Sequence, residues 1–464
     1  MTASPTPWHT RWLRRSVAVL AVLVVVVGVG RSGQVWLESR QSGPRIPYLQ
    51  NVPPDAITVR WQSTEPVPGE VRYGEAPDAL VRVVREGEPT TVHQLRLTGL
   101  KAATRYYYAI ADGGDKVSYG GPDYSFVTAP PAGSASPLRF WVQGDPGRYH
   151  DGSRAVHAAM RTWVAAHPRD KRPPLDLWLT TGDNGYPSGR DQDYQQALFD
   201  AYPELLRTIP YVPVYGNHDA RRLAFFRLFT FPEQGEGGGV PSGTPHYFAF
   251  DYGNVHFIVL DSQESDRGEE GAMMSWLRRD LAATRQMWRI VLFHHPPYTR
   301  ATHDSDSKAD SLGRMTDMRE NFLPLLEEQG VDLVLTGHSH IYERTPLLRC
   351  HYGKRNSFRP EMIAQPGDGG ALPYRKPLGA VARSGTVYAV VGSTSNLDTG
   401  PLDHPANRVV RAEFGSLMIE VTGDTLVASF INAAGDTTDR FSIVKSVEAG
   451  VQPHSCAELV SSPR

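Results

Sequence analysis

The chain is long enough for two or three domains, and its composition is that of a soluble globular protein. It has 464 residues, of which 40% are hydrophobic and 21% are charged. With 48 Lys and Arg against 50 Asp and Glu, the formal net charge is -2. No global positive field therefore favours nucleic acid or an acidic membrane surface, and we expect no nucleic-acid partner. Recognition of any anionic ligand must be local.

Residues 1–40 have the pattern of a targeting segment. Three arginines precede an apolar run from Val17 to Val29, which is the charge layout of an export signal peptide. The run is shorter than the roughly 20 residues that a membrane span needs. Because no A-x-A cleavage site follows it, an uncleaved N-terminal membrane anchor remains an alternative. Both interpretations predict an exported, extracellular or cell-envelope protein that meets a membrane only through this segment.

The two cysteines, Cys350 and Cys456, are too few for a thiolate zinc cluster or an iron–sulfur site. Outside the cytoplasm they could form one disulfide that ties the C-terminal tail, residues 446–464, to the main body. The alternative is two unpaired thiols, and the sequence leaves both open.

Residues 41–130 are predicted to form an all-β sandwich. Ala56–Trp61 alternates apolar and polar residues, as a half-buried strand does, and no helical period appears in this region. Further strands are expected at 69–73, 91–97, 105–111 and 124–127. The stretch Leu97–Leu100, followed by Thr104–Tyr108, resembles the late strands of fibronectin type III domains. The resemblance implies a fibronectin III-like sandwich.

After a Pro- and Ser-rich linker at residues 131–137, strands alternate with helices through residue 445, which predicts an α/β domain. We expect a β-sandwich core of two layers, flanked by helices. The expected helices are 153–166, 191–206, 269–283 and 318–328. The expected strands are 138–142, 175–180, 211–215, 247–251, 255–260, 288–293, 331–335, 386–391, 414–421 and 425–431. Residues 352–380 have no clear period and are predicted to be an inserted loop.

Five short turns in this region carry metal-ligand residues, and each follows a predicted strand. The residues are Asp145, Asp183, Tyr186, Asn217, His294, His338 and His340. Any one of these turns alone would be an ordinary turn. Because ligands gather at the carboxyl ends of strands in α/β sheets, their joint occurrence predicts one shared site at a common edge. Carboxylate, phenol, amide and imidazole groups together suit two adjacent metal ions, one hard and one borderline.

These turns, with the flanking sequences 337–344 and 385–392, resemble the metallophosphoesterases and, within them, the purple acid phosphatases. The wider superfamily has Asp-x-His in its first motif, whereas this chain has Gly147 there and Tyr186 three residues after Asp183. That exchange is typical of the purple acid phosphatases. The resemblance implies a calcineurin-like metallophosphoesterase domain over residues 138–445, preceded by the sandwich.

The same resemblance implies a ligand set for two ions that share Asp183. Fe³⁺ would be held by Asp145, Asp183, Tyr186 and His340. A divalent ion, Zn²⁺, Mn²⁺ or Fe²⁺, would be held by Asp183, Asn217, His294 and His338. A phenolate oxygen is a hard anionic ligand, and it suits Fe³⁺ better than imidazole does.

The implied activity is hydrolysis of phosphate monoesters by attack of a metal-bound hydroxide. His218 would donate to the phosphate oxygens; alternatively, it hydrogen-bonds a neighbouring backbone carbonyl. His303 would protonate the leaving group, or His295 would assist instead. Asp219 is expected to hold His218 or to cap a turn.

Two other functions remain open at this stage. The first is a divalent-metal phosphodiesterase of the wider superfamily, against which Tyr186 argues. The second is a non-enzymatic cell-surface binding protein, against which the complete ligand set argues. The sequence leaves the natural substrate and the oligomeric state open.

Overall fold

The computed structural model describes residues 43–112, 116–170, 172–447 and 456. The predicted export signal or anchor in residues 1–40, and most of the predicted tail at 446–464, lie outside these residues. Within the described ranges, no helix has the length and apolar character needed to cross a membrane.

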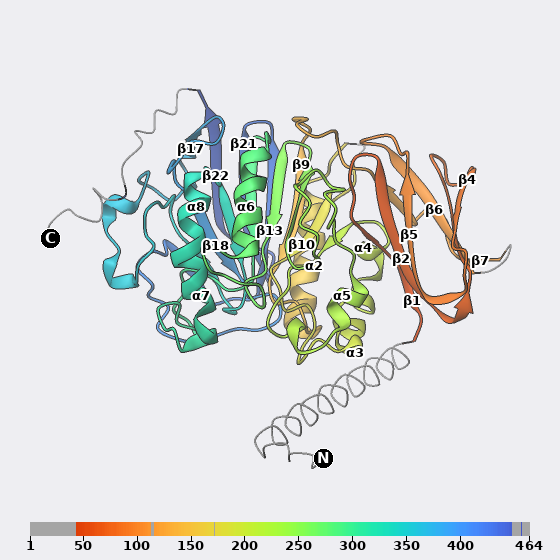
Figure 1. Cartoon of the computed structure of the whole chain (residues 1–464), viewed down its shortest axis with the longest axis horizontal. Coiled ribbons are helices and arrows are strands. Elements are labelled where there is room, and N and C mark those ends of the chain that lie inside the picture. The colour runs from red at the N-terminus through yellow and green to blue at the C-terminus, as the bar shows by residue number, and fades with distance from the viewer. Residues whose placement is uncertain (1–42, 113–115, 171, 448–455, 457–464) are drawn as a thin grey trace, which may run out of the picture. The chain divides into compact units, whose positions relative to one another are not determined.

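The N-terminal domain is a sandwich of two antiparallel sheets, as the alternating sequence predicts (Figure 1). One sheet has the order β1-β2-β5; the other has the order β4-β3-β6-β7, with β8 paired to β6. Their strands are β1 (Arg45–Gln50), β2 (Ala56–Val67), β3 (Gly69–Gly74), β4 (Arg82–Arg85), β5 (Thr90–Thr98), β6 (Arg105–Asp112), β7 (Val117–Tyr119) and β8 (Ser125–Val127). The core between the sheets includes Ile57, Trp61 and Tyr108, all nearly or fully buried.

The first sheet of the following α/β domain has the order β11-β10-β9-β20-β21-β22-β17. Its strands are β9 (Leu138–Gln143), β10 (Leu177–Thr180), β11 (Tyr211–Val212), β17 (Tyr374–Pro377), β20 (Gly415–Thr422), β21 (Thr425–Asn432) and β22 (Thr437–Ser446). The neighbours β9, β10 and β11 run parallel, so their carboxyl ends meet at one edge.

The second sheet has the order β12-β13-β14-β15-β18-β16-β19. Its strands are β12 (Phe248–Tyr252), β13 (Val255–Val259), β14 (Trp288–Leu292), β15 (Leu333–Thr336), β16 (Tyr342–Arg344), β18 (Val387–Val391) and β19 (Val409–Arg411). The four strands from β13 through β14 and β15 to β18 are parallel. The near-continuous apolar sequence of these strands fits their burial on both faces.

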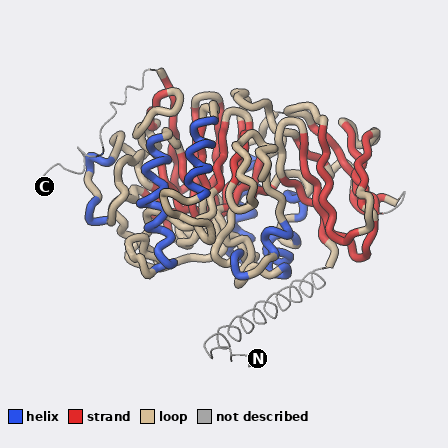
Figure 2. The backbone as a smooth tube through the Cα atoms, in the orientation of Figure 1, coloured by secondary structure: helices blue, strands red, loops and turns tan. Residues whose placement is uncertain are grey.

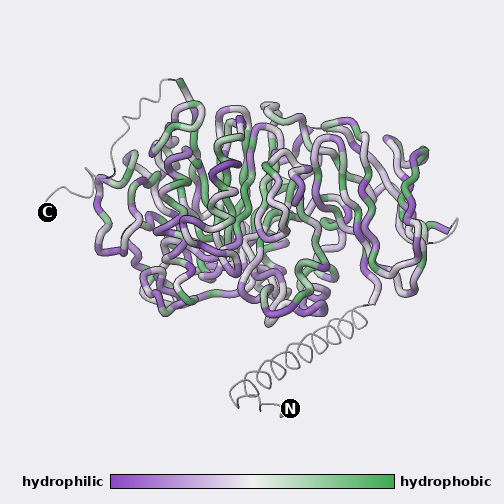
Figure 3. Tube along the Cα trace, in the orientation of Figure 1, coloured by the Kyte–Doolittle hydropathy of each residue, from purple (hydrophilic) through white to green (hydrophobic). Residues whose placement is uncertain are grey.

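The two sheets pack on each other, which confirms the predicted two-layered core. Phe140 of β9 and Phe257 of β13 have ring centroids 5.1 Å apart, and Trp288 Nε1 donates to the Gly423 carbonyl across the layers at 2.9 Å. The apolar residues follow the central strands (Figure 3). Helices of this domain lie against its strands, whereas the N-terminal sandwich consists of strands and loops (Figure 2).

Helices cover the outer faces of this core, and one of the predicted ones, 191–206, is broken. The helices are α2 (Asp151–Ala166), α3 (Asp191–Tyr194), α4 (Pro203–Leu206), α5 (Ala224–Leu228), α6 (Ala272–Ala283), α7 (Arg314–Asp317) and α8 (Leu323–Glu328). The prediction of a continuous helix at 191–206 was wrong, because a π-helical turn at Gln195–Phe199 interrupts it and Pro203 starts a new helix. A second π-helical turn, Met318–Phe322, precedes α8.

The prediction that residues 352–380 form only a loop was also wrong, since they contain β17, an edge strand parallel to β22. The inward-facing residues of β17 are Tyr374 and Lys376, and the buried Lys376 pairs with Asp332 at 2.8 Å. A charged residue at an inward position hides the apolar alternation that marks a strand.

Cys350 and Cys456 form a disulfide, so the alternative of two unpaired thiols was wrong. The bond fastens a residue of the C-terminal tail to the segment that follows β16.

Candidate metal centre

The five ligand turns converge at the carboxyl ends of strands from both sheets of the α/β domain. Asp145 and Asp183 follow β9 and β10 of the first sheet, whereas His294 and His338 follow β14 and β15 of the second. The prediction of one shared sheet edge is therefore corrected: the ends of two packed sheets meet, and each supplies part of the site. Asn217 follows β11 through a short connection.

Three of the predicted ligands surround the phenol of Tyr186. Its Oη lies 3.2 Å from Asp145 Oδ1, 3.0 Å from Asp183 Oδ2 and 3.0 Å from His340 Nε2. Asp145 and Asp183 are 0% and 1% exposed. Three oxygen atoms and one nitrogen therefore converge, although one phenol proton can satisfy only one of the three contacts of Tyr186.

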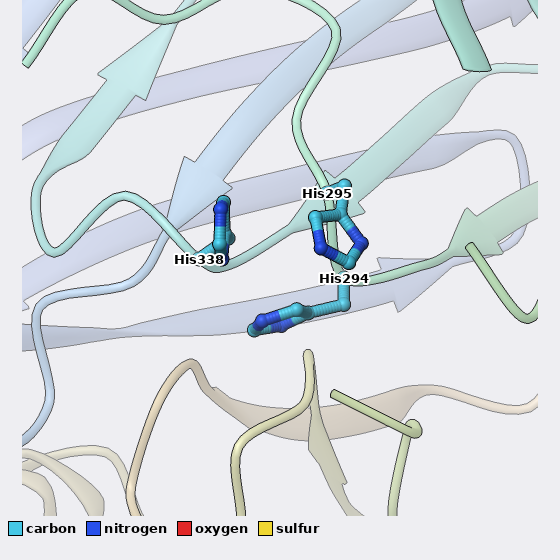
Figure 4. Close-up of side chains that lie close together, drawn as sticks. All are labelled: His294, His295 and His338. Atoms are coloured by element: carbon cyan, nitrogen blue, oxygen red, sulfur yellow. The ribbon is translucent and has the colours of Figure 1, made fainter. Parts of the chain in front are cut away.

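The other predicted ligands surround the amide oxygen of Asn217. Asn217 Oδ1 lies 2.9 Å from both His294 Nε2 and His338 Nδ1. His294 Nδ1 is 2.8 Å from the Thr181 carbonyl, which only accepts, so Nδ1 carries the proton. In the neutral ring, Nε2 then presents a lone pair to the Asn217 oxygen. His294 and His338 lie close together (Figure 4), and a cation between their nitrogens and the Asn217 oxygen would compensate these facing lone pairs.

The backbone at three of these residues is held in the left-handed region. Asp145, Asp183 and His338 have φ values of 54°, 55° and 68°, which cost energy in residues other than glycine and cluster at functional sites. Each carboxylate is also fixed by a backbone donor. The His338 N–H bonds Asp145 Oδ2 at 2.9 Å, and the His218 N–H bonds Asp183 Oδ1 at 2.8 Å.

Glycines beside the ligands leave the space that these side chains occupy. A Cβ on Gly182 would lie 2.4 Å from His294 Nδ1, and a Cβ on Gly216 would lie 2.3 Å from Asp183 Oδ1. No other residue type fits at these two positions without displacing a predicted ligand.

The electrostatics of these seven side chains call for positive charge. Burial and the neighbouring Asp183 hold the pKa of Asp145 well above its usual value, and the same two causes raise the pKa of Tyr186. Burial also lowers the pKa of His294 and His338, which keeps both imidazoles neutral and able to donate lone pairs. Two carboxylates, a phenol, an amide oxygen and three imidazoles fit one hard and one borderline ion.

Further residues, which the sequence analysis did not select, orient the predicted ligands. Asp398 accepts from His340 Nδ1 at 3.0 Å and from the His340 N–H at 2.9 Å. Ser311 Oγ lies 2.7 Å from His338 Nε2. Asp398 follows β18, a parallel strand beside β15, so the strand-end rule could have found it. Ser311 lies in a loop without a sequence signal.

Asp219 caps a turn, as one of its two predicted roles required, and does not contact the His218 ring. It is 0% exposed and accepts from the Gly216 N–H at 2.9 Å. It also accepts from the N–H of Asn184 at 3.0 Å and from the hydroxyl of Tyr194 at 2.7 Å. Asp219 therefore joins the turn that carries Asn217 to the turn that carries Asp183.

His218 lies beside the Tyr186 ring, with ring centroids 4.5 Å apart. Its Nδ1 donates to the Pro187 carbonyl at 2.6 Å, which is the alternative contact considered from the sequence. Its Nε2 remains on the side of the pocket, 3.9 Å from Asp183 Oδ2 and 3.4 Å from an Arg221 nitrogen. The backbone contact thus fixes the ring without using the atom that faces the site.

His303 and His295 lie on different sides of His338. The His303 ring stacks on His338 with centroids 3.9 Å apart, and its side chain is 28% exposed. His295 is 1% exposed, and its Nδ1 contacts Ser262 Oγ at 2.8 Å. One nitrogen of His295 lies within 4.8 Å of nitrogens on His294 and His338, so it belongs to the buried wall of the site. This position suits support of His338 better than contact with a substrate.

Two family profiles match the chain. Residues 138–342 match the calcineurin-like phosphoesterases, and residues 46–128 match the purple acid phosphatase N-terminal domain. The chain is similar to purple acid phosphatase 18 of Arabidopsis thaliana, with 29% identity over 74% of this chain and 76% of that protein. It is also similar to purple acid phosphatase 22 of the same plant, with 30% identity over 62% of this chain and 61% of that protein. The chain therefore spans about three-fifths of the second relative.

The fold is similar to that of purple acid phosphatase PPD1 from yellow lupin seeds, with a TM-score of 0.67 and 18% identity. That match covers 91% of this chain and 77% of the lupin chain. The fold and the profile matches define a metal-dependent phosphoesterase of the hydrolase class. The chain belongs to the purple acid phosphatase family of the metallophosphoesterases, which implies a dinuclear metal centre.

Proposed function

We propose that this protein is an exported purple acid phosphatase that hydrolyses phosphate monoesters at a centre of Fe³⁺ and one divalent ion. The carrying observation is the position of Tyr186, whose Oη lies 3.0–3.2 Å from one nitrogen and two carboxylate oxygens of other predicted ligands. A phenol in that place adds a hard anionic oxygen, the ligand type that favours trivalent iron.

In this proposal Fe³⁺ is held by Asp145, Asp183, Tyr186 and His340, and the divalent ion by Asp183, Asn217, His294 and His338. Asp183 serves both, in keeping with its Oδ2 beside Tyr186 and its Oδ1 3.5 Å from His294 Nε2. Such a pair of ions would supply positive charge that neutralises the phosphoryl oxygens. It would also lower the pKa of water, so that hydroxide is available to attack phosphorus. Zn²⁺, Mn²⁺ and Fe²⁺ all suit the second donor set.

The chain's own residues orient the substrate and move protons. His218 keeps Nδ1 on the Pro187 carbonyl, so only the doubly protonated ring donates from Nε2 toward a phosphate oxygen. Burial lowers the pKa of His218, and acidic conditions therefore favour the donating form. His303, on the exposed side of His338, is assigned to protonate the leaving oxygen. His295 supports the wall behind His338.

Hydrolysis of a panel of phosphate monoesters and diesters at several pH values tests this function. We expect the purified protein, loaded with iron and zinc, to cleave monoesters best under acidic conditions. Asp183→Asn should abolish cleavage, because both ions depend on this carboxylate, whereas Asp200→Asn on the exposed surface should keep it. Preferential diester cleavage by a protein active with two divalent ions would favour the phosphodiesterase alternative. Unchanged turnover in Asp183→Asn would refute the proposed site.

Export is the second part of the proposal, and the disulfide supports it. A bond between Cys350 and Cys456 is typical of oxidising compartments, as is the basic and apolar pattern of residues 1–40. Fractionation of cells that produce the full chain should place it outside the cytoplasm. Recovery in the cytoplasm with both thiols reduced would refute export.

A further inference from the structure

A single carboxylate, Asp310, connects two of the proposed functional histidines. Its Oδ1 lies 2.9 Å from His303 Nδ1 and accepts from Ser311 Oγ at 2.8 Å. Ser311 Oγ in turn lies 2.7 Å from His338 Nε2. Asp310 Oδ2 accepts from the backbone N–H of Asp304 at 2.9 Å, which fixes the rotation of the carboxyl group.

The proton positions in this chain of contacts follow from donor and acceptor chemistry. An ionised carboxylate only accepts hydrogen bonds, so the Ser311 hydroxyl donates its proton to Asp310. Ser311 Oγ must then accept a hydrogen bond from His338 Nε2–H. The proton of His338 is thereby fixed on Nε2, and Nδ1 keeps its lone pair toward Asn217. By the same reasoning His303 carries a proton on Nδ1, which leaves Nε2 directed away from Asp310.

The backbone from Ser311 to Gly313 has an unfavourable left-handed conformation. Ser311, Leu312 and Gly313 have φ values of 50°, 55° and 77°, three successive residues in the left-handed region. Leu312 is 76% exposed, so burial of its side chain does not explain the conformation. The bend places Ser311 Oγ between Asp310 and His338. Strain of this kind persists where the surrounding contacts require it.

We propose that Asp310 is a positioning residue that fixes the tautomer and ring orientation of both histidines, His303 directly and His338 through Ser311. The proposal rests on the proposed function, since it takes His303 as the proton donor to the leaving group and His338 as a metal ligand. The new element is that one carboxylate fixes the orientation of both histidines. Hydrogen bonds to the outer nitrogen of a ligating histidine generally orient the ring and strengthen its metal binding.

The first test compares Asp310→Asn with Asp304→Asn. Asp304 lies on the same loop, but its carboxylate contacts Arg355 at 3.0 Å and neither histidine. We measure kcat and KM at saturating concentrations of both metal ions. The substrates are an alkyl phosphate, whose leaving group needs a proton, and 4-nitrophenyl phosphate, whose leaving group needs little help. Asp310→Asn should lose about 10- to 100-fold in kcat on the alkyl ester, little on the nitrophenyl ester, and little in KM. Asp304→Asn should resemble wild type.

The second test uses Ser311→Ala, which removes the hydroxyl oxygen and keeps the Cβ. It interrupts the contact to His338 and leaves Asp310 beside His303. We expect the dissociation constant of the second metal ion, measured by chelator competition, to rise about tenfold or more. The ratio of rates on the two esters should stay at the wild-type value.

The outcomes separate this inference from the function on which it rests. If wild-type protein cleaves neither ester, the proposed function fails. If wild type is active and Asp310→Asn loses equally on both esters, or matches Asp304→Asn, the positioning of His303 is refuted. If folded Ser311→Ala binds the second ion as tightly as wild type does, the link to His338 is refuted. Circular dichroism and thermal melting verify that each variant folds.

Discussion

The contact between Asp398 and His340 provides a sharp test of the proposed iron site. Asp398 holds His340 through both carboxylate oxygens, one on Nδ1 at 3.0 Å and one on the backbone N–H at 2.9 Å. These contacts leave His340 Nε2 facing Tyr186 Oη at 3.0 Å. Asp398→Asn keeps the shape of the side chain but removes its charge and one of its acceptor oxygens.

The size of the effect follows from the geometry. The Asp398 side chain is 8% exposed, so water replaces the lost contacts poorly. Burial alone would raise the pKa of Asp398, but the hydrogen bonds and charge of His340 outweigh it and lower the pKa, so Asp398 stays an ionised acceptor. Loss of such a partner typically weakens metal binding by about 10- to 100-fold, or about 1.4–2.8 kcal/mol.

The assay is competition of the protein with a chelator for iron, with iron and the second metal quantified separately. We expect Asp398→Asn to bind iron about 10- to 100-fold more weakly and the second ion nearly as well. Asp403→Asn is the matched control, since this carboxylate pairs with Arg300 at 2.7 Å on the surface. Equal iron affinity in folded Asp398→Asn and wild type would refute the assignment of His340 to the iron.

Three further predictions concern stability. The unfolding free energy should fall by about 3 kcal/mol as pH rises from 6.5 to about 9, because hydrogen bonds to Asp251 and Asp280 outweigh burial and raise the pKa of His256 to about 9. The stabilisation is complete below pH 6.5, and urea titrations of His256→Gln should lack this dependence. Cys456→Ser should lower the unfolding free energy by about 2–4 kcal/mol, with an unchanged value contradicting the disulfide. Gly216→Ala should cost about 1–3 kcal/mol by crowding Asp183, whereas Gly87→Ala faces open space and should cost little.

The sequence predicted the sandwich, the two-layered core and most strands, because their apolar residues repeat with the period of their burial. The sequence-based prediction failed where the apolar pattern does not reveal the backbone conformation. The π-helical turn within 191–206 leaves the apolar pattern almost unchanged. The strand β17 turns a lysine inward because Asp332 compensates its charge, and such a partner is distant in sequence.

The structure brings all seven predicted ligands together. Five of them stand directly after a glycine, which made their turns visible in the sequence: Asp145, Asp183, Tyr186, Asn217 and His338. Their supporting residues were missed for a physical reason. Asp310 and Ser311 act through a loop whose left-handed backbone has no composition signal at Leu312. Asp398 follows β18, but it lies some residues beyond the strand end at Val391, and no second predicted ligand stands beside it.

The visible absorption spectrum of the iron-loaded protein, measured for wild type and Tyr186→Phe, tests the central claim most directly. Wild type should be coloured by charge transfer from a phenolate to Fe³⁺, with one iron and one divalent ion per chain. Tyr186→Phe should lose the band while the divalent ion remains. A colourless wild type that hydrolyses phosphate esters without iron would contradict the account, as would a band that survives in Tyr186→Phe.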